Sequence, residues 1–243
     1  AIRLFDPAGL AFAGSSADDS LAGNVGDDIL SGNLGDDSLQ GNDGRDFLRG
    51  GDGDDFLRGD FDADTLYGDD GNDIILAGAG KDRINGNAGD DTISGGAGAD
   101  SINGGAGEDT VIFTQDAGPV TVKLWNGTGA GGSAQGDTYS SIENVVGSAF
   151  SDTIIGLSNR SNKLEGGAGN DTIDGLSGND TVKGDAGNDL LIGGAGADLI
   201  DGGLGTDTAN YSKSGAAVSV SLITNAGVGG DAQGDMLSGV ENL

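Results

Sequence analysis

Aspartates recur at every ninth residue over a long stretch of the sequence, and they are the residues best suited to chemistry. Between Gly14 and Ile112 the chain divides into eleven consecutive nine-residue blocks with no insertion or deletion. The sixth residue of every block is aspartate. These residues are Asp19, Asp28, Asp37, Asp46, Asp55, Asp64, Asp73, Asp82, Asp91, Asp100 and Asp109. Carboxylates repeated at one fixed spacing are suited to binding hard cations through oxygen.

The same spacing returns between residues 147 and 210 in a less regular form. The aspartates of this second array are Asp152, Asp171, Asp180, Asp189, Asp198 and Asp207. One block, from Gly156 to Glu165, has ten residues and carries Asn162 where an aspartate belongs. Phe150 stands where a turn glycine belongs. We therefore expect fewer good sites in this half.

The other residues of each block predict the elements that position the aspartates. The first six positions are turn-forming, because glycine permits positive φ and Asn and Asp tolerate left-handed conformations. The eighth position is aliphatic in all eleven blocks of the first array, which suits a three-residue strand whose middle side chain points inward. Two blocks then close one eighteen-residue coil. The fixed period predicts an all-β solenoid, a parallel β-roll with two sheets around a thin aliphatic core.

Stacked coils would place aspartates eighteen residues apart above one another, in one ladder along each edge. Carboxylates about 5 Å apart repel by about 1 kcal/mol even in water, so each ladder needs cations between its rungs. A site with six or more oxygen ligands, many of them backbone carbonyls, favours calcium over magnesium. Counting aspartate pairs eighteen residues apart gives nine candidate sites in the first array and three in the second. Without calcium we expect a loose chain, because metal binding and folding are then one equilibrium.

Composition excludes several classes of function. The net charge of −29 disfavours nucleic acid and anionic membranes as partners. The sequence has no Cys and no His, which removes disulfides, thiolate chemistry, the Ser-His-Asp triad and the usual zinc ligands. No apolar run reaches the length of a transmembrane helix, so we expect no membrane insertion by this chain. Disorder is the general expectation for so polar a chain, but it does not require an aliphatic residue at every eighth position.

We divide the chain into five segments. They are a lead-in strand and cap (1–13), the first array (14–112), a strand-loop flank (113–146), the second array (147–210) and a second, truncated copy of the flank (211–243). The two flanks match at a spacing of 98 residues, with Val120–Leu124 returning as Val218–Leu222. The second copy stops at Leu243 where the first continues, and the chain begins at Ala1 without Met. We expect it to be a piece of a longer protein.

Several residues allow other interpretations. Asp60, Asp62 and Asp64 resemble the start of an EF-hand loop, but the closing glycine and glutamate are missing and the nine-residue register already explains them. Asp137 and Asp235 end degenerate turns and are further candidates for calcium. Trp125 and Tyr139 are candidates for stacking on a sugar, with packing as the simpler role. Clustered carboxylates serve as catalysts in some solenoids, but here the register assigns almost every carboxylate, and we expect no enzyme.

The repeated blocks resemble the Gly-Gly-x-Gly-x-Asp-x-U-x nonapeptide of RTX (repeats-in-toxin, haemolysin-type) proteins, where U is aliphatic. The block Gly50-Gly-Asp-Gly-Asp-Asp-Phe-Leu-Arg58 follows that pattern throughout. The resemblance implies that carbonyls of two successive coils and two aspartates surround each ion. One site would then use the carbonyls of Gly51, Gly53, Gly68 and Asp70, together with Asp55 and Asp73. Departures from the pattern predict weaker turns at Ser15, Ala17, Asp60, Asp62 and Ala77.

The resemblance also implies a function. We expect the calcium-binding β-roll region of a secreted bacterial protein, exported by a type I system and folded by calcium outside the cell. Its expected location is extracellular or at the cell surface, with self-association or polysaccharide contact as further possibilities. The alternative is a structural role, as a tile of a surface layer or a stalk of a giant adhesin.

Overall fold

The computed structural model describes residues 9–243, and in this range it contains strands, tight turns and three single-turn 3-10 helices. These helices are η1 (Leu124–Asn126), η2 (Gly132–Ala134) and η3 (Gly230–Ala232). Contacts divide the chain into two compact units, Ala1–Val111 with Ser133–Ile142, and Ile112–Gly132 with Glu143–Leu243. None of the described residues forms a helix long and apolar enough to cross a membrane.

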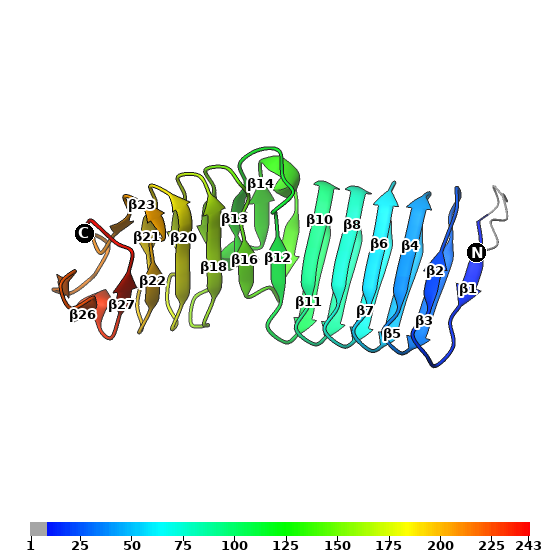
Figure 1. Cartoon of the computed structure of the whole chain (residues 1–243), viewed down its shortest axis with the longest axis horizontal. Coiled ribbons are helices and arrows are strands. Elements are labelled where there is room, and N and C mark those ends of the chain that lie inside the picture. Colours follow the sequence, from blue (N-terminus) through cyan, green and yellow to red (C-terminus); the bar gives the residue numbers. More distant parts are fainter. Residues whose placement is uncertain (1–8) are drawn as a thin grey trace. The chain divides into compact units, whose positions relative to one another are not determined.

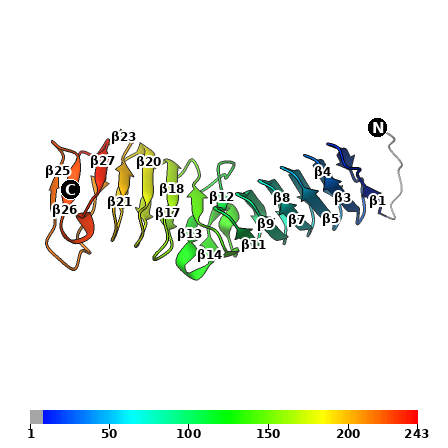
Figure 2. The ribbon, with the colours of Figure 1, turned by 90° about the horizontal axis from the view of Figure 1, so that it is seen from below.

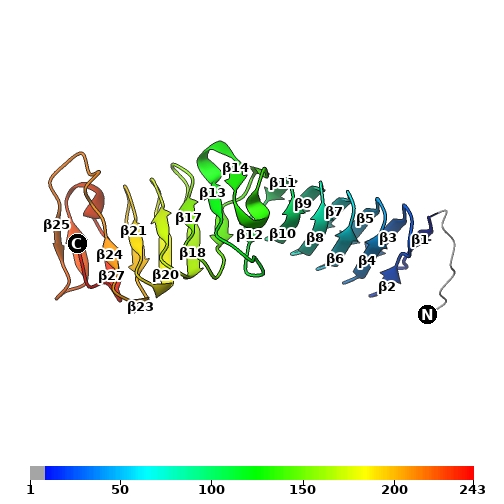
Figure 3. The same cartoon turned by 90° about the horizontal axis from the view of Figure 1, so that it is seen from above.

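The first unit consists of two parallel sheets that share the coils between them (Figures 1 and 3). One sheet contains, in spatial order, β1 (Ala11–Ala13), β3 (Ile29–Leu34), β5 (Phe47–Asp52), β7 (Thr65–Asp70), β9 (Arg83–Ala88), β11 (Ser101–Ala106) and β15 (Thr138–Ser140). The other contains β2 (Ser20–Ala22), β4 (Ser38–Asp43), β6 (Phe56–Phe61), β8 (Ile74–Gly80), β10 (Thr92–Gly98) and β12 (Thr110–Ile112). Figure 3 shows the odd-numbered strands on one side of this unit and the even-numbered strands on the other. The predicted parallel β-roll is confirmed.

The register of the first unit is eighteen residues, as two blocks per coil predict. Leu30 lies opposite Leu48, and Leu48 lies opposite Leu66. Each of these side chains is fully buried, whereas the residues on either side of Leu48, Phe47 and Arg49, face outward and are exposed. The aliphatic eighth position therefore forms most of the core between the sheets, because strand side chains alternate between the two faces.

Strands β3 to β11 are longer than the three residues that we predicted. Each has six or seven residues and continues into the first three positions of the next block, as β5 does through Asp52. The extension remains paired across coils, with Gly51 opposite Asp69 and Asp52 opposite Asp70. A positive φ at the second position, +126° at Gly51, bends the chain without interrupting this pairing. Glycine at this position thus bends the chain and still allows the pairing between strands to continue.

The second unit repeats the two-sheet plan with shorter strands (Figures 1 and 2). One sheet contains β14 (Thr128–Ala130), β13 (Thr121–Lys123), β17 (Thr153–Ile155), β19 (Thr172–Asp174), β21 (Leu190–Ile192) and β24 (Thr208–Ala209). The other contains β16 (Asn144–Val146), β18 (Lys163–Ala168), β20 (Thr181–Gly187), β22 (Leu199–Asp201), β27 (Met236–Ser238), β26 (Ala226–Val228) and β25 (Ser219–Ser221), and β23 (Leu204–Gly205) pairs with β20. Parallel pairing again aligns buried aliphatic residues, including Ile154, Ile173 and Leu191.

The flank sequences form hairpins. β13 pairs antiparallel with β14, and β25 pairs antiparallel with β26, so both copies fold alike at this point. β1 forms the last three residues of the predicted lead-in segment (1–13), and the first eight residues of that segment lie outside the described residues. Trp125 is 57% exposed, but Tyr139 is only 7% exposed and lies opposite Ile102 in the core. Of the two roles considered for Tyr139, the structure shows packing, because its ring lies inside the first unit.

Candidate metal centre

The predicted aspartate ladders are present in both units, and backbone hydrogen bonds connect their rungs. The N–H of each rung donates to Oδ1 of the aspartate one coil later, at 2.7 Å from Asp37 to Asp55 and 2.8 Å from Asp55 to Asp73. One ladder of the first unit runs through Asp19, Asp37, Asp55, Asp73, Asp91 and Asp109, and the other through Asp28, Asp46, Asp64, Asp82, Asp100 and Asp137. The ladders of the second unit run through Asp152, Asp171, Asp189 and Asp207, and through Asn162, Asp180, Asp198 and Asp235.

The second carboxylate oxygen of most rungs is buried and has no hydrogen-bond donor. Within residues 9–243 this holds for Oδ2 of Asp37, Asp46, Asp55, Asp64, Asp73, Asp82, Asp91, Asp100, Asp171, Asp180, Asp189, Asp198 and Asp207. Each of these side chains is at most 3% exposed. Buried charged oxygens are stable only when paired or bound to a metal. The pattern therefore indicates a missing positive partner at each of these rungs.

Most of these spare oxygens face a small space beside the glycine at the first position of their block. A methyl group on Gly50 would collide with Asp55 Oδ2 and lie 2.6 Å from the carbonyl oxygen of Gly68, one coil later. The same pair of atoms faces Gly32, Gly41, Gly59, Gly68, Gly86, Gly166, Gly175 and Gly184. We call this space, bounded by a first-position glycine, its aspartate Oδ2 and the carbonyl one coil later, the cradle. A carboxylate and a carbonyl facing one point are the donors that calcium prefers.

Burial raises the pKa of the ladder aspartates in the absence of metal. It raises the pKa of Asp64 to about 8, and that of Asp73 and Asp91 to about 7, with neighbouring carboxylates adding to the shift. Backbone hydrogen bonds to the carboxylates oppose this rise. The charged form is thus disfavoured by desolvation and by like charge, and a bound cation would reverse both effects.

The first turn of each array differs from the interior turns. The backbone N–H of Ser15 donates to Asp19 Oδ2 at 2.6 Å, and that of Asn24 donates to Asp28 Oδ2 at 2.6 Å. In the second array Ser148 donates to Asp152 Oδ2 at 2.6 Å. In all three carboxylates the chain donates a hydrogen bond to Oδ2, and this separates them from the interior rungs. Asn162 is engaged in the same way, because its Oδ1 accepts the Leu157 N–H at 2.7 Å.

The four carbonyls expected around one ion are not arranged alike. Gly68 presents its oxygen to the cradle beside Asp55, as expected. The carbonyl of Asp70 instead accepts the N–H of Gly53 at 2.8 Å. A methyl group on Gly71 would collide with the carbonyl oxygen of Gly53, which therefore faces the neighbouring turn. Gly51, with its positive φ, lies in the paired extension of β5.

A second ladder, which the sequence analysis missed, runs beside the first at the fifth position of the blocks. Asp54 N–H donates to Asp36 Oδ1 at 2.9 Å, Asn72 N–H to Asp54 Oδ1 at 2.7 Å, and Asp90 N–H to Asn72 Oδ1 at 2.7 Å. These hydrogen bonds are exposed to solvent. The neutral side chain of Asn72 accepts a backbone hydrogen bond in this ladder, just as the side chains of Asp36 and Asp54 do. This ladder therefore needs a side-chain oxygen that accepts a hydrogen bond, and it does not need a negative charge. The recurrence of Asp or Asn at every eighteenth residue was the available signal.

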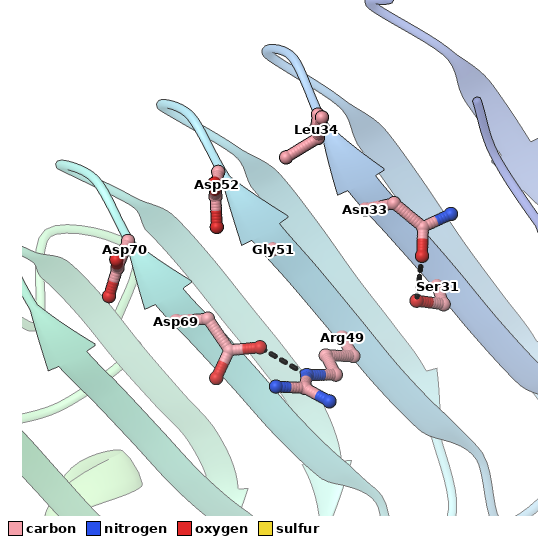
Figure 4. Close-up of a pocket in the computed structure, with 8 residues that line it drawn as sticks. All are labelled: Ser31, Asn33, Leu34, Arg49, Gly51, Asp52, Asp69 and Asp70. Atoms are coloured by element: carbon pink, nitrogen blue, oxygen red, sulfur yellow. Dashed lines mark hydrogen bonds and ion pairs between the residues drawn. The ribbon is translucent and has the colours of Figure 1, made fainter. Parts of the chain in front are cut away.

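Several carboxylates outside the ladders lie on the outer surface of the first unit. Figure 4 shows Leu34, Asp52 and Asp70 in a row at the ends of β3, β5 and β7, in a shallow groove on the outer surface. Asp69 lies in the same groove and forms an ion pair with Arg49. Asp60, one of the residues resembling an EF-hand loop, forms an ion pair with Arg58 at 2.5 Å. Exposed pairs of this kind contribute little to stability, and they leave the ladders as the candidate metal centre.

The ladder residues fit a hard cation that takes many of its ligands from the backbone. Within residues 9–243 no three acidic, cysteine or histidine side chains gather around one point, so carbonyl oxygens would have to complete each shell. Calcium accepts such shells of six to eight oxygens with flexible geometry. The cradle supplies one buried carboxylate oxygen and one carbonyl oxygen from successive coils, and further oxygens would have to complete the shell.

Comparison with known proteins agrees with this geometry. A search of curated proteins finds no match to the chain. The family described as RTX calcium-binding nonapeptide repeat matches in seven overlapping segments, residues 13–48, 40–75, 49–82, 76–111, 146–182, 158–191 and 174–209. These segments cover both arrays and more than half of the 243 residues. The chain therefore belongs to the family of RTX calcium-binding nonapeptide repeats, and its many repeats bind multiple calcium ions.

Proposed function

We propose that calcium folds this chain, and that the ladder aspartates are the residues that hold the ions. Each interior ion would lie in a cradle, as between Asp55 Oδ2 and the Gly68 carbonyl, and would neutralise carboxylates that otherwise repel. Calcium would supply positive charge there and would be coordinated by oxygens of the chain. This role does not require calcium to activate a substrate. We infer no catalytic role for this region.

The main support for this proposal is the row of buried Oδ2 atoms that have no hydrogen-bond donor. An ordinary structural aspartate has both oxygens hydrogen-bonded, as Asp152 does, whose Oδ1 accepts the Val120 N–H at 2.7 Å and whose Oδ2 accepts the Ser148 N–H at 2.6 Å. Interior rungs such as Asp55 and Asp73 instead bury one oxygen without a donor. A metal-free chain must bear this desolvation at each interior rung with an unpartnered Oδ2, and the thin aliphatic core offers little to offset it.

A secreted protein would use this dependence. In low-calcium cytosol the chain would stay loose enough to pass through a type I secretion channel. In millimolar calcium outside the cell it would fold, consistent with the weak affinities of extracellular calcium modules. The net charge of −29 opposes binding to nucleic acid and supports calcium as the principal partner. We place the protein outside the cell or at its surface.

The test is a calcium titration of the 243-residue chain, followed by far-UV circular dichroism and size-exclusion chromatography. We expect a change from coil to β-structure with calcium and none with magnesium at the same concentration. If the signal shows no gain between chelator and millimolar calcium, the proposal is wrong. Ordered sheets or large assemblies at high calcium would instead favour the tile or stalk role.

Two neighbouring aspartates give a matched pair of variants. Asp55 is buried in the sixth-position ladder, whereas Asp54 belongs to the exposed fifth-position ladder. Asp55→Asn should raise the calcium concentration needed for folding and lower the number of bound ions by two, because Asp55 faces both Asp37 and Asp73. Asp54→Asn removes the same charge and should leave the number of bound ions unchanged. Equal loss in both variants would contradict the assignment of calcium to the buried ladder.

A further inference from the structure

The last coil of the second unit closes its two ladders in different ways. One ladder ends at Asp207 and the other continues from Asp198 to Asp235. Residues of the second flank cover both ends. The two ends differ in what the flank presents to the spare carboxylate oxygen.

At the Asp235 end, a tyrosine hydroxyl donates a hydrogen bond to Oδ2, the oxygen that has no donor in the interior rungs. Asp235 Oδ1 accepts the Asp198 N–H at 3.0 Å, and Tyr211 donates its hydroxyl to Asp235 Oδ2 at 2.8 Å. The first unit has the same closure, with Tyr139 donating to Asp137 Oδ2 at 3.1 Å. The two tyrosines come from different positions of the flank. A hydroxyl donor here closes the ladder without a cation.

At the Asp207 end, a glutamate takes the place of the next aspartate. Glu241 Oε2 accepts the Asp207 N–H at 2.8 Å, as Asp207 Oδ1 accepts the Asp189 N–H at 2.8 Å one coil earlier. The N–H groups of Glu241 and Asn242 donate to the Asp207 carbonyl at 3.2 and 2.9 Å. These bonds fix the segment against the last coil, so that Glu241 acts as one further rung.

The flank also completes a cradle at this end. Asp207 is fully buried, and its Oδ2 has no hydrogen-bond donor. A methyl group on Gly202 would lie 2.7 Å from that oxygen and would collide with the carbonyl oxygen of Gly239. Gly239 thus presents the carbonyl that Gly202 presents to the interior cradle of Asp189.

The other end lacks this carbonyl. The three atoms nearest to a methyl group on Gly193 all belong to Asp198. The first unit repeats the completed cradle, because a methyl group on Gly104 would meet the carbonyl of Ser141. Ser141 precedes Gly239 by 98 residues, the spacing of the two flanks. The same edge is therefore completed in both copies.

We propose that Asp207, the Gly239 carbonyl and Glu241 form an additional calcium site that the nonapeptide pattern does not contain. This inference rests on the proposed function, in which the interior cradles hold calcium. Two carboxylates and a carbonyl oxygen suit this hard cation. The Asp207 oxygen is buried whereas Glu241 is exposed, so the ion would reach the site from solvent at the end of the coil. The site links the flank to the array in the presence of calcium.

Equilibrium dialysis against calcium, with bound metal counted by elemental analysis, tests the proposal on the 243-residue chain. Glu241→Gln should bind one ion fewer than the unmodified chain while keeping the same circular dichroism spectrum at saturating calcium, because Glu241 is an exposed residue. Asp231→Asn removes a charge from the same flank, and its bound calcium should remain unchanged. Asp207→Asn should lose two ions, one shared with Asp189 and one with Glu241.

The double variant Asp207→Asn with Glu241→Gln should bind as many ions as Asp207→Asn alone, because both residues serve one ion. Fewer ions in the double variant, or an unchanged number in Glu241→Gln, would overturn the site. Asp189→Asn reports on the interior cradles separately. If it retains all of its calcium while Glu241→Gln loses one ion, the proposed function fails for the interior ladder and the terminal site stands.

Discussion

Ala77 occupies the one first-position site in the first array that is not glycine, and we predict that Ala77→Gly opens a calcium site. At the equivalent Gly68, an added methyl would collide with Asp73 Oδ2 and lie 2.7 Å from the Gly86 carbonyl. Ala77 carries such a methyl, and its side chain is fully buried. The cradle beside Asp82 is therefore filled by carbon, although Asp82 Oδ2 has no donor.

The size of the effect depends on calcium in a way that a purely structural change would not. Replacing Ala by Gly costs about 0.5–1 kcal/mol in chain entropy, and losing one buried methyl costs about 0.8 kcal/mol. A new site contributes about 2.7 kcal/mol when calcium is 100 times its dissociation constant. The variant should thus be less stable than the unmodified chain near the calcium midpoint of folding, and about 1 kcal/mol more stable at high calcium.

Urea unfolding at a series of calcium concentrations measures this reversal. One additional ion should steepen the dependence of the unfolding free energy by about 1.4 kcal/mol for each tenfold rise in calcium. Ala97→Gly, at an exposed position of β10, carries a similar entropy cost and should lower stability at every calcium concentration. If Ala77→Gly behaves like Ala97→Gly and binds no additional ion, the cradle is not where calcium lies.

Two further predictions concern acid and the fifth-position ladder. In chelator, lowering the pH from 8 to 5 should increase β-structure measured by far-UV circular dichroism, because burial raises the pKa of Asp64 to about 8 and that of Asp73 to about 7. The folded chain then binds protons more strongly than the unfolded chain, so its stability is present below these pKa values and lost as pH rises through them; a pH-independent spectrum would contradict this. At saturating calcium, Asp54→Ala should cost about 0.5–1.5 kcal/mol in urea unfolding, since the Asn72 N–H loses its acceptor. Asp54→Asn keeps that acceptor and should cost nothing, so equal losses would refute the role of the side-chain oxygen.

The core and the ladder register could be predicted because one rule repeats without exception. Leu48 and Asp55 occupy the eighth and sixth positions of adjacent blocks, and their neighbours one coil away are Leu66 and Asp73. Once two blocks make one coil, the spacing of eighteen residues places each residue above the residue at the same block position in the next coil. No long-range information is needed, since each coil contacts only its neighbours.

The ends of the arrays could not be predicted by that rule. Glu241 follows Asp207 by 34 residues, and Asp235 follows Asp198 by 37, so neither falls on the period of eighteen. Their positions depend on how the flank hairpin folds back over the last coil, which the sequence does not state. The length of the strands was also underestimated, because the glycine-rich positions of β5 were assigned to turns although they pair with β7.

In the proposed function, it is burial and not acidity that makes the fold depend on calcium, as a comparison of the two neighbouring ladders indicates. Both ladders use an Asp side chain to accept a backbone N–H from an adjacent coil, at 2.7 Å for Asp54 and 2.7 Å for Asp55. Asp54 keeps its remaining oxygen in water, and Asn72 substitutes for an acid in that ladder without loss of the hydrogen bond. Asp55 is 2% exposed, and its Oδ2 has no hydrogen-bond donor. This oxygen lies near the carbonyl oxygen of Gly68, one coil later. A glycine at the first position leaves space there, and a buried anion beside a carbonyl is stable only if that space holds a cation.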